Sequence, residues 1–309
     1  DFLLQKGRNV MAKLILLGVL VLFALGYLYI FVSDFWKHRH TLSHHAWWKF
    51  IVLGLITDFF DTLGIGNFAP TASAFKLGKL VDDNLIPGTM NAGHCLPVIA
   101  EALIFMTVIE VDSLTLILMV AAAVVGAVWG AGIVARMNLR AIRIGMGIAL
   151  IGVAFVLLAG LLKWMPSGGT ATGLYGAKLV FAVFVNFILG GLMTIGVGQY
   201  APCMALVYSL GLNPKVSFPI MMSSCAFLMP AGSARFIKEQ AIDRKAAMGI
   251  AIGGIPGVLI ASYIITSLPL TLLKWVVLAV LVYTATNMLI AGLKNAGSQR
   301  DTELEPATR

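Results

Sequence analysis

Runs of apolar residues close to the roughly 20 that an α-helix needs to cross a bilayer recur along this chain, and they constrain its fold more than any other feature. Hydrophobic residues form 59% of the 309 residues and charged residues only 12%, which is too few to cover the surface of a soluble domain of this size. The runs are long and continuous, whereas a membrane β-barrel would show short alternating segments. The sequence therefore predicts an all-α polytopic membrane protein in contact with the lipid bilayer.

The net charge of +8 does not indicate binding to nucleic acid, because the basic residues lie mostly in short loops between apolar runs, where they set the orientation in the membrane. The three cysteines, Cys95, Cys203 and Cys225, have no spacing typical of a disulfide framework or a zinc site. We expect them to be small buried residues, and we predict neither a metal nor a cofactor.

One motif occurs twice. Residues 64–70 read Gly-Ile-Gly-Asn-Phe-Ala-Pro, and residues 196–202 read Gly-Val-Gly-Gln-Tyr-Ala-Pro, an offset of 132 residues (196 − 64). At the same offset, three further residues match, namely Thr62 with Thr194, Pro87 with Pro219 and Gly160 with Gly292. Helix-breaking glycines inside apolar runs, at equivalent places in two halves, are typical of the binding site of a secondary transporter.

The repeat predicts the organisation of the chain. Each half has two short apolar pieces that the motif separates, at 49–63 and 67–78 and at 178–195 and 199–210. Three spans follow in each half, at about 86–108, 114–134 and 142–162 and at about 216–235, 246–266 and 271–293. The predicted units are residues 1–46 with one helix (14–32, retained) and a His-rich loop, a first repeat at 47–162, a linker at 163–175, a second repeat at 176–293 and a polar, disordered tail at 294–309.

Basic loops indicate how the short pieces are arranged. If each pair forms a hairpin that returns to its starting side, the loops around Arg140 and Arg244 lie on one side and the acidic Glu110 and Asp112 on the other, as the positive-inside rule predicts. A hairpin plus three spans is an odd number of crossings, so the two halves are predicted to be inverted repeats. The pieces, at about 12–18 residues, are short for a full crossing, which favours re-entrant hairpins and leaves two full crossings as the alternative.

The motifs predict a pocket for a small anion. The proline of each motif lies in the first turn of a new helix, where its missing N–H costs no hydrogen bond. The free N–H groups of that turn and the positive end of the helix dipole attract anions, and glycines let a ligand approach the backbone. The alternative is that the glycines only permit close helix packing. The predicted binding residues are Gly64, Gly66, Asn67, Phe68 and Thr71, their equivalents Gly196, Gly198, Gln199, Tyr200 and Cys203, and Asn91, His94, Ser223 and Ser224 in the spans that follow.

Few ionisable residues lie inside spans, and these are functional candidates. Asp58 and Asp61 are three residues apart on one helical face, and Gly190 and Met193 stand at their positions in the second half. We predict that Asp58, Asp61 and His94 couple transport to protons. The alternatives are a position near the membrane surface or a structural role, and Glu101 is a further intramembrane carboxyl group without a supporting motif.

The loop at 33–48 carries four histidines, His38, His40, His44 and His45, with tryptophans typical of an interfacial belt. A histidine cluster can bind a metal ion, but this spacing is irregular, and we expect a solvated or interfacial loop.

The short apolar helix, the Gly-x-Gly motif and the following proline, repeated in two halves, resemble the sulfite exporter TauE/SafE family, also called the toluene sulfonate uptake permease family. The resemblance covers nearly all of residues 47–293. Typical members have Gly-x-Gly-Gly, where this chain has Asn67 and Gln199 as the fourth residue, so we expect a divergent member. The resemblance implies proton-linked transport of sulfur-containing anions such as sulfite, sulfoacetate, thiosulfate or organic sulfonates.

The sequence therefore predicts a secondary transporter of small anions that works by alternating access in a bacterial cytoplasmic (inner) membrane. Its expected partners are the anion, protons, the bilayer and a second copy of the chain. An anion channel is the alternative, although it would need a continuous polar path. An intramembrane enzyme is a third hypothesis. The best set of catalytic residues for it would be His94, Cys95 and Glu101, but no sequence motif supports this set.

Overall fold

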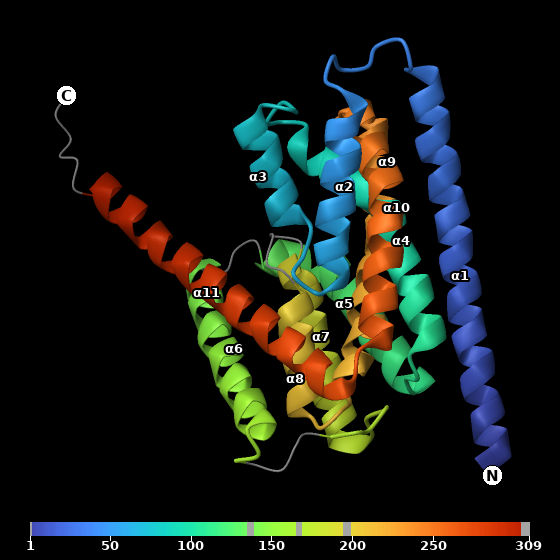
Figure 1. Cartoon of the computed structure of the whole chain (residues 1–309), viewed down its shortest axis with the longest axis vertical. Helices are drawn as coiled ribbons and strands as arrows, with labels where there is room; N and C mark the ends of the chain where they lie inside the picture. Colours follow the sequence, from blue (N-terminus) through green and yellow to red (C-terminus); the bar gives the residue numbers. More distant parts are fainter. Residues whose placement is uncertain (1, 135–138, 165–168, 194–198, 304–309) are drawn as a thin grey trace.

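The computed structural model describes residues 2–134, 139–164, 169–193 and 199–303. In these ranges the elements of secondary structure are helices, and no β-strand is formed (Figure 1). The helices are α1 (Phe2–Lys37), α2 (Trp47–Thr62), α3 (Phe68–Gly78), α4 (Ile86–Val108), α5 (Ser113–Val134), α6 (Leu139–Leu161), α7 (Gly176–Met193), α8 (Tyr200–Ser209), a short 3-10 helix η1 (Pro214–Val216), α9 (Ser217–Lys238), α10 (Arg244–Ser267) and α11 (Leu270–Glu303).

Seven of the described helices are long and apolar enough to cross a membrane: α1, α4, α6, α7, α9, α10 and α11. Large apolar side chains are exposed on the outside of the bundle, for example Tyr29 on α1, Val180 on α7 and Tyr263 on α10. In water such a surface would be unfavourable, whereas in a bilayer it faces acyl chains. The chain is an all-α polytopic membrane protein, as its sequence predicts.

Two pairs of helices form hairpins whose open ends point in opposite directions (Figure 1). In the view of Figure 1, α2 runs down to the first motif and α3 runs back up, whereas α7 runs up to the second motif and α8 runs back down. The arms α2, α3 and α8 have 16, 11 and 10 residues, fewer than the roughly 20 of a full crossing.

The helices pair in the same way in both halves. α2 packs along α10, and α7 packs along α5, so that the first arm of each hairpin lies on the second span of the other half. The first spans α4 and α9 pack on each other, as do the third spans α6 and α11.

Close contacts between single residues recur in the two hairpin–span pairs. Equivalent residues are 132 apart between α2 and α7 (187 − 55) and 131 apart between α5 and α10 (257 − 126). In five of the six contacts a glycine permits the approach, because a Cβ atom there would collide with the facing residue; the sixth, Asn186–Met119, is a hydrogen bond. The equivalent pairs are Leu55–Gly257 with Phe187–Gly126, Gly54–Ile250 with Asn186–Met119, and Asp58–Gly254 with Gly190–Ala123.

Polar contacts between loops fix the ends of the bundle. Asp112 begins α5 by accepting the Thr115 N–H, and its own N–H donates to Thr172 O in the segment predicted as a linker. At the other end, Arg244 of α10 donates to both carboxylate oxygens of Asp34 at the end of α1.

The tail differs from the prediction. Residues from Lys294 onward were expected to be disordered, but α11 continues as a helix to Glu303. No proline interrupts this stretch before Pro306, and a helix can extend from the end of a stable span into polar residues.

Candidate transport site

The first motif turns the chain between α2 and α3 at two glycines. Gly64 and Gly66 both have φ = 92°, a left-handed conformation that a residue with a Cβ adopts only with strain. In the second motif, Thr194, Gly196 and Gly198 lie outside the described residues. The backbone geometry expected of the motif is therefore seen at its first copy.

Both α3 and α8 begin directly after the motif amide, with the proline in their first turn. Their first helical hydrogen bonds are donated by Thr71 N–H to Asn67 O and by Cys203 N–H to Gln199 O. The preceding amide groups, such as Ala69 N–H in α3, have no partner within the helix, as at every helix N-terminus. These groups are the donors that the sequence predicts for an anion.

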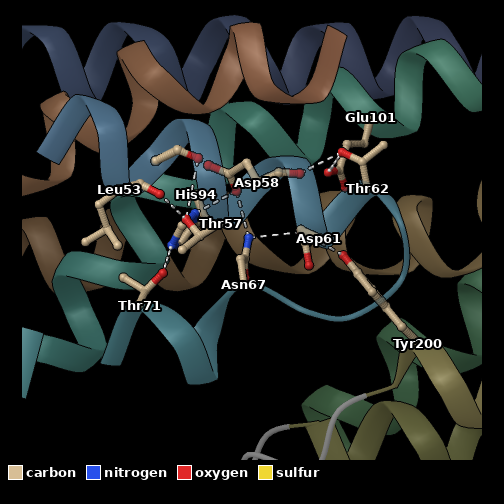
Figure 2. Close-up of polar contacts among 11 residues, drawn as sticks. Leu53, Thr57, Asp58, Asp61, Thr62, Asn67, Thr71, His94, Glu101 and Tyr200 are labelled. Atoms are coloured by element: carbon tan, nitrogen blue, oxygen red, sulfur yellow. Dashed lines mark hydrogen bonds and ion pairs between the residues drawn. The ribbon is translucent and has the colours of Figure 1, made fainter. Parts of the chain in front are cut away.

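Asn67 bridges the two aspartates. Its Nδ2 donates to Asp58 Oδ1 and to Asp61 Oδ2, each at 2.9 Å, so that both amide hydrogens are used (Figure 2). Both carboxyl groups are buried in the protein, at 0% and 1% exposure. The sequence suggested Asn67 as a donor to the anion, but in this conformation the amide is occupied by Asp58 and Asp61.

His94 of α4 joins the same cluster. Its Nδ1 lies 2.7 Å from Asp58 Oδ1, and its Nε2 lies 3.0 Å from Thr71 Oγ1 in the first turn of α3 (Figure 2). With the Nδ1 proton donated to Asp58, a neutral imidazole accepts the Thr71 hydroxyl proton at Nε2. The imidazole therefore connects the carboxyl group of α2 with the start of α3.

The second half has amides where the first has carboxyl groups. Gln199 Nε2 donates to Asn186 Oδ1 at 3.3 Å, and Asn186 Nδ2 donates to Met119 O at 2.7 Å. The backbone carbonyl fixes the orientation of Asn186 and hence that of Gln199. The buried Gln199 Oε1 and the buried Ser223 hydroxyl have no hydrogen-bond partner among the described residues.

The two halves meet at Tyr200 and Asp61. The hydroxyl of Tyr200, the first residue of α8, donates to Asp61 Oδ2 at 3.4 Å (Figure 2). The first turn of α8 is thus in contact with the cluster that borders the first turn of α3. Through this contact, Tyr200 of the second motif joins the cluster that contains Asn67 of the first motif.

Glu101 adds a third carboxyl group. It is fully buried on α4, and its Oε1 lies 2.6 Å from Thr62 Oγ1, the last residue of α2 (Figure 2). Its Oε2 has no hydrogen-bond partner in the described part of the chain.

The site is therefore acidic in its first half and neutral in its second. Of the three carboxyl groups Asp58, Asp61 and Glu101, Asp58 contacts His94, whereas the described ion pairs with arginine lie at Asp34 and Glu239, away from the cluster. An isolated charge in this position is expensive, so bound protons or hydrogen bonds must offset the carboxylates.

The other predicted residues surround this cluster or lie apart from it. Phe68 packs its ring 6.0 Å from that of His94, and Cys203 is buried in the first turn of α8. Asn91 turns its amide to Pro87 O and Ser224 its hydroxyl to Ile220 O, each within its own helix, so the structure does not bring these two side chains into the cluster. All three cysteines are free and buried.

In the histidine loop, the His38 ring contacts Asp34 and the His45 ring lies edge-on to Phe50. Within the described residues no group of His, Cys, Asp and Glu side chains is arranged to hold a metal ion.

The sequence did not reveal three members of the arrangement. Asn186 is a polar residue within an apolar run, which is a usable signal of a buried role. Gly254 lies outside the two motifs, and it makes room for the Asp58 side chain. The contact of Glu101 with Thr62 joins residues 39 apart and has no signal in the spacing.

The comparisons with known proteins agree with the motif. No curated protein and no solved structure matches the chain significantly. The sequence model of one family, described as sulfite exporter TauE/SafE, matches residues 179–308, which begin in α7 and include the second motif. Residues 179–308 thus match the sequence model of the sulfite exporter TauE/SafE family, in agreement with the resemblance of the two motifs.

Proposed function

We propose that this protein is a secondary transporter of small sulfur-containing oxyanions in a bacterial inner membrane. The anion is held between the N-termini of α3 and α8, and its movement is coupled to protons on Asp58, Asp61 and His94. The support for a transporter and for sulfur-containing anions is the match of residues 179–308 to the sulfite exporter TauE/SafE family.

The observation that carries the proposal is the contact of Tyr200 with Asp61. It joins the first turn of α8 to the cluster at the start of α3, so that free helix N–H groups from both halves border one place. The equivalent contacts of α2 with α10 and of α7 with α5 support an inverted repeat, in which the two halves exchange conformations around this place.

The acidic cluster sets the sign of the coupling. Ionised Asp58 and Asp61 repel an anion at the start of α3, and they also occupy both hydrogens of Asn67. A proton on either aspartate removes one negative charge and weakens its hold on the amide, which can then turn to the anion. Protons and anion therefore strengthen each other's binding, and the two move in the same direction across the membrane.

The function is tested by flux in proteoliposomes. Sulfite, sulfoacetate, thiosulfate, sulfate, chloride and a carboxylate are each offered with and without a pH gradient. We expect uptake of sulfur oxyanions that increases when the side containing the anion is acidic. An equally large chloride flux that ignores pH would instead indicate a channel, and no flux for any anion would overturn the proposal.

A further inference from the structure

Thr62 makes two contacts with only one hydroxyl hydrogen. Its Oγ1 lies 2.8 Å from Asp58 O, one helical turn earlier in α2, and 2.6 Å from Glu101 Oε1 on α4. Both partners are oxygen atoms. A backbone carbonyl can only accept, whereas a carboxyl group accepts when ionised and donates when protonated.

Counting hydrogens assigns the donor in each contact. If Thr62 donates to the Asp58 carbonyl, the contact of 2.6 Å needs a hydrogen from Glu101, which is then a neutral carboxylic acid. Every hydrogen of the pair has an acceptor in this arrangement. If Glu101 were ionised, both oxygens would compete for one hydrogen.

Burial favours the protonated form as well. Glu101 is fully buried, and its Oε2 has no partner among the described residues. The described ion pairs do not include Glu101. A carbonyl-type oxygen without a partner costs far less free energy than an unpaired negative charge in the same place.

The groups that interact electrostatically with Glu101 come from three other helices. They are Asp58 and Asp61 on α2, Tyr200 on α8 and Cys225 on α9. None of these groups carries a positive charge. Ionising Glu101 while the aspartates are ionised would place three negative charges in one apolar region, so its proton is released only when the conformation or the charge of this region changes.

We propose that Glu101 is a proton-carrying residue of the transport cycle in addition to Asp58, Asp61 and His94, and that Thr62 is its positioning residue. In the conformation described here the proton is on Glu101 Oε1 and is donated to Thr62 Oγ1. The inference rests on the proposed function, because it assigns one of the protons that move with the anion.

The test compares Glu101→Gln with the wild-type protein in proteoliposomes. A glutamine Nε2 can donate to Thr62 in place of the acid, but it cannot release a proton. We expect Glu101→Gln to keep its thermal stability and to exchange anion for anion, and to move about one proton fewer per anion than the wild type. The ratio is measured from labelled anion and an internal pH dye.

Two control variants separate proton transfer from packing. Glu110→Gln removes an exposed carboxyl group just beyond the same helix and is expected to leave the ratio unchanged. Thr62→Val keeps the shape of Thr62 but removes the acceptor of the Glu101 proton, and we expect it to shift the pH profile of net flux without abolishing exchange, whereas Thr62→Ser keeps the wild-type profile.

The outcomes distinguish the two proposals. If the wild type moves no anion at all, the proposed function fails. If the wild type shows proton-linked flux and Glu101→Gln has the same ratio, the role of Glu101 is overturned and the transporter stands. Should Glu101→Gln fail to fold, Thr62→Val decides, because a pH profile identical to that of the wild type would contradict the proposal.

Discussion

The side chain of Asp58 on α2 fits against α10 because residue 254 of α10 is a glycine. A Cβ atom on Gly254 would collide with Asp58 Oδ2 and would lie 2.5 Å from Pro97 Cγ. In the second half, the equivalent residues are Gly190 and Ala123, where the small residue is on the hairpin helix instead. Each helix pair therefore has room for one side chain at this position. In the α2–α10 pair that side chain is on the hairpin helix, and in the α7–α5 pair it is on the span.

We predict that Gly254→Ala moves the Asp58 carboxyl group away from His94 and Asn67. Overpacking of this kind destabilises proteins by about 1–3 kcal/mol. Proton-linked flux should fall together with the thermal stability in detergent. Gly232→Ala in α9 is the matched control, because its Cβ would have only Asn91 Oδ1 near it, at 4.0 Å, and an alanine there is expected to be neutral or slightly stabilising.

The double variant Asp58→Gly/Gly254→Ala imitates the arrangement of the second half. The added methyl group then occupies space that the lost carboxyl group leaves. We expect thermal stability to recover relative to Gly254→Ala, while proton coupling remains lost. A double variant no more stable than Gly254→Ala would contradict the proposed equivalence of the two helix pairs.

The two motif amides should differ in their effect on stability. Asn67→Leu removes the donor shared by Asp58 and Asp61, and leaving buried acceptors short of a partner costs about 1–3 kcal/mol. Gln199→Leu removes one contact of 3.3 Å to Asn186, a loss of about 0.5–1.5 kcal/mol. Both variants should lower anion flux. Equal stability of both variants and the wild type in a thermal shift measurement would contradict the role of Asn67 as a bridge between carboxyl groups.

The pH dependence of anion binding follows from the charge of the cluster. Protonation of Asp58 or Asp61 removes a negative charge beside the anion, so the Kd of a bound sulfur oxyanion should fall as the pH falls. For each linked proton, log Kd changes by up to about 1 per pH unit. Asp61→Asn should flatten this dependence, as measured by isothermal titration calorimetry at several pH values. A Kd that rises at acidic pH would reverse the proposed sign of the coupling.

Much of the fold could be predicted from the sequence, because bilayer-spanning helices must satisfy their own backbone groups and must be apolar. The span predicted at 86–108 is α4, and the helices α2 and α3 begin and end within two residues of the predicted pieces. The repeated motif also located both hairpins. These features depend on local sequence alone.

The site was only partly predictable. The sequence identified Asp58, Asp61, Asn67 and His94 separately, but it could not show that Asn67 donates to both aspartates, since the bridge depends on how α3 folds back along α2. Contacts between helices far apart in the chain, such as Glu101 with Thr62, are set by packing and have no local pattern.

Arg244 should anchor α1, the helix that lies outside the two repeats. Its guanidinium donates to Asp34 Oδ2 at 2.7 Å and to Asp34 Oδ1 at 3.3 Å, and both side chains are only 12–13% exposed. This pair holds the end of α1 against the start of α10. A two-point arginine–carboxylate contact of this burial is stronger than an exposed ion pair, so Arg244→Ala should lower the free energy of unfolding by about 1–2 kcal/mol. Arg235→Ala is the matched control, because Arg235 pairs with Glu239 in a highly exposed position and its loss should not change the free energy of unfolding measurably.

Limited proteolysis of the loop between α1 and α2 measures the anchoring directly. Faster cleavage is expected in Arg244→Ala alone. Equal cleavage in both variants would show that α1 is held by its apolar contacts with α4 and α9 instead.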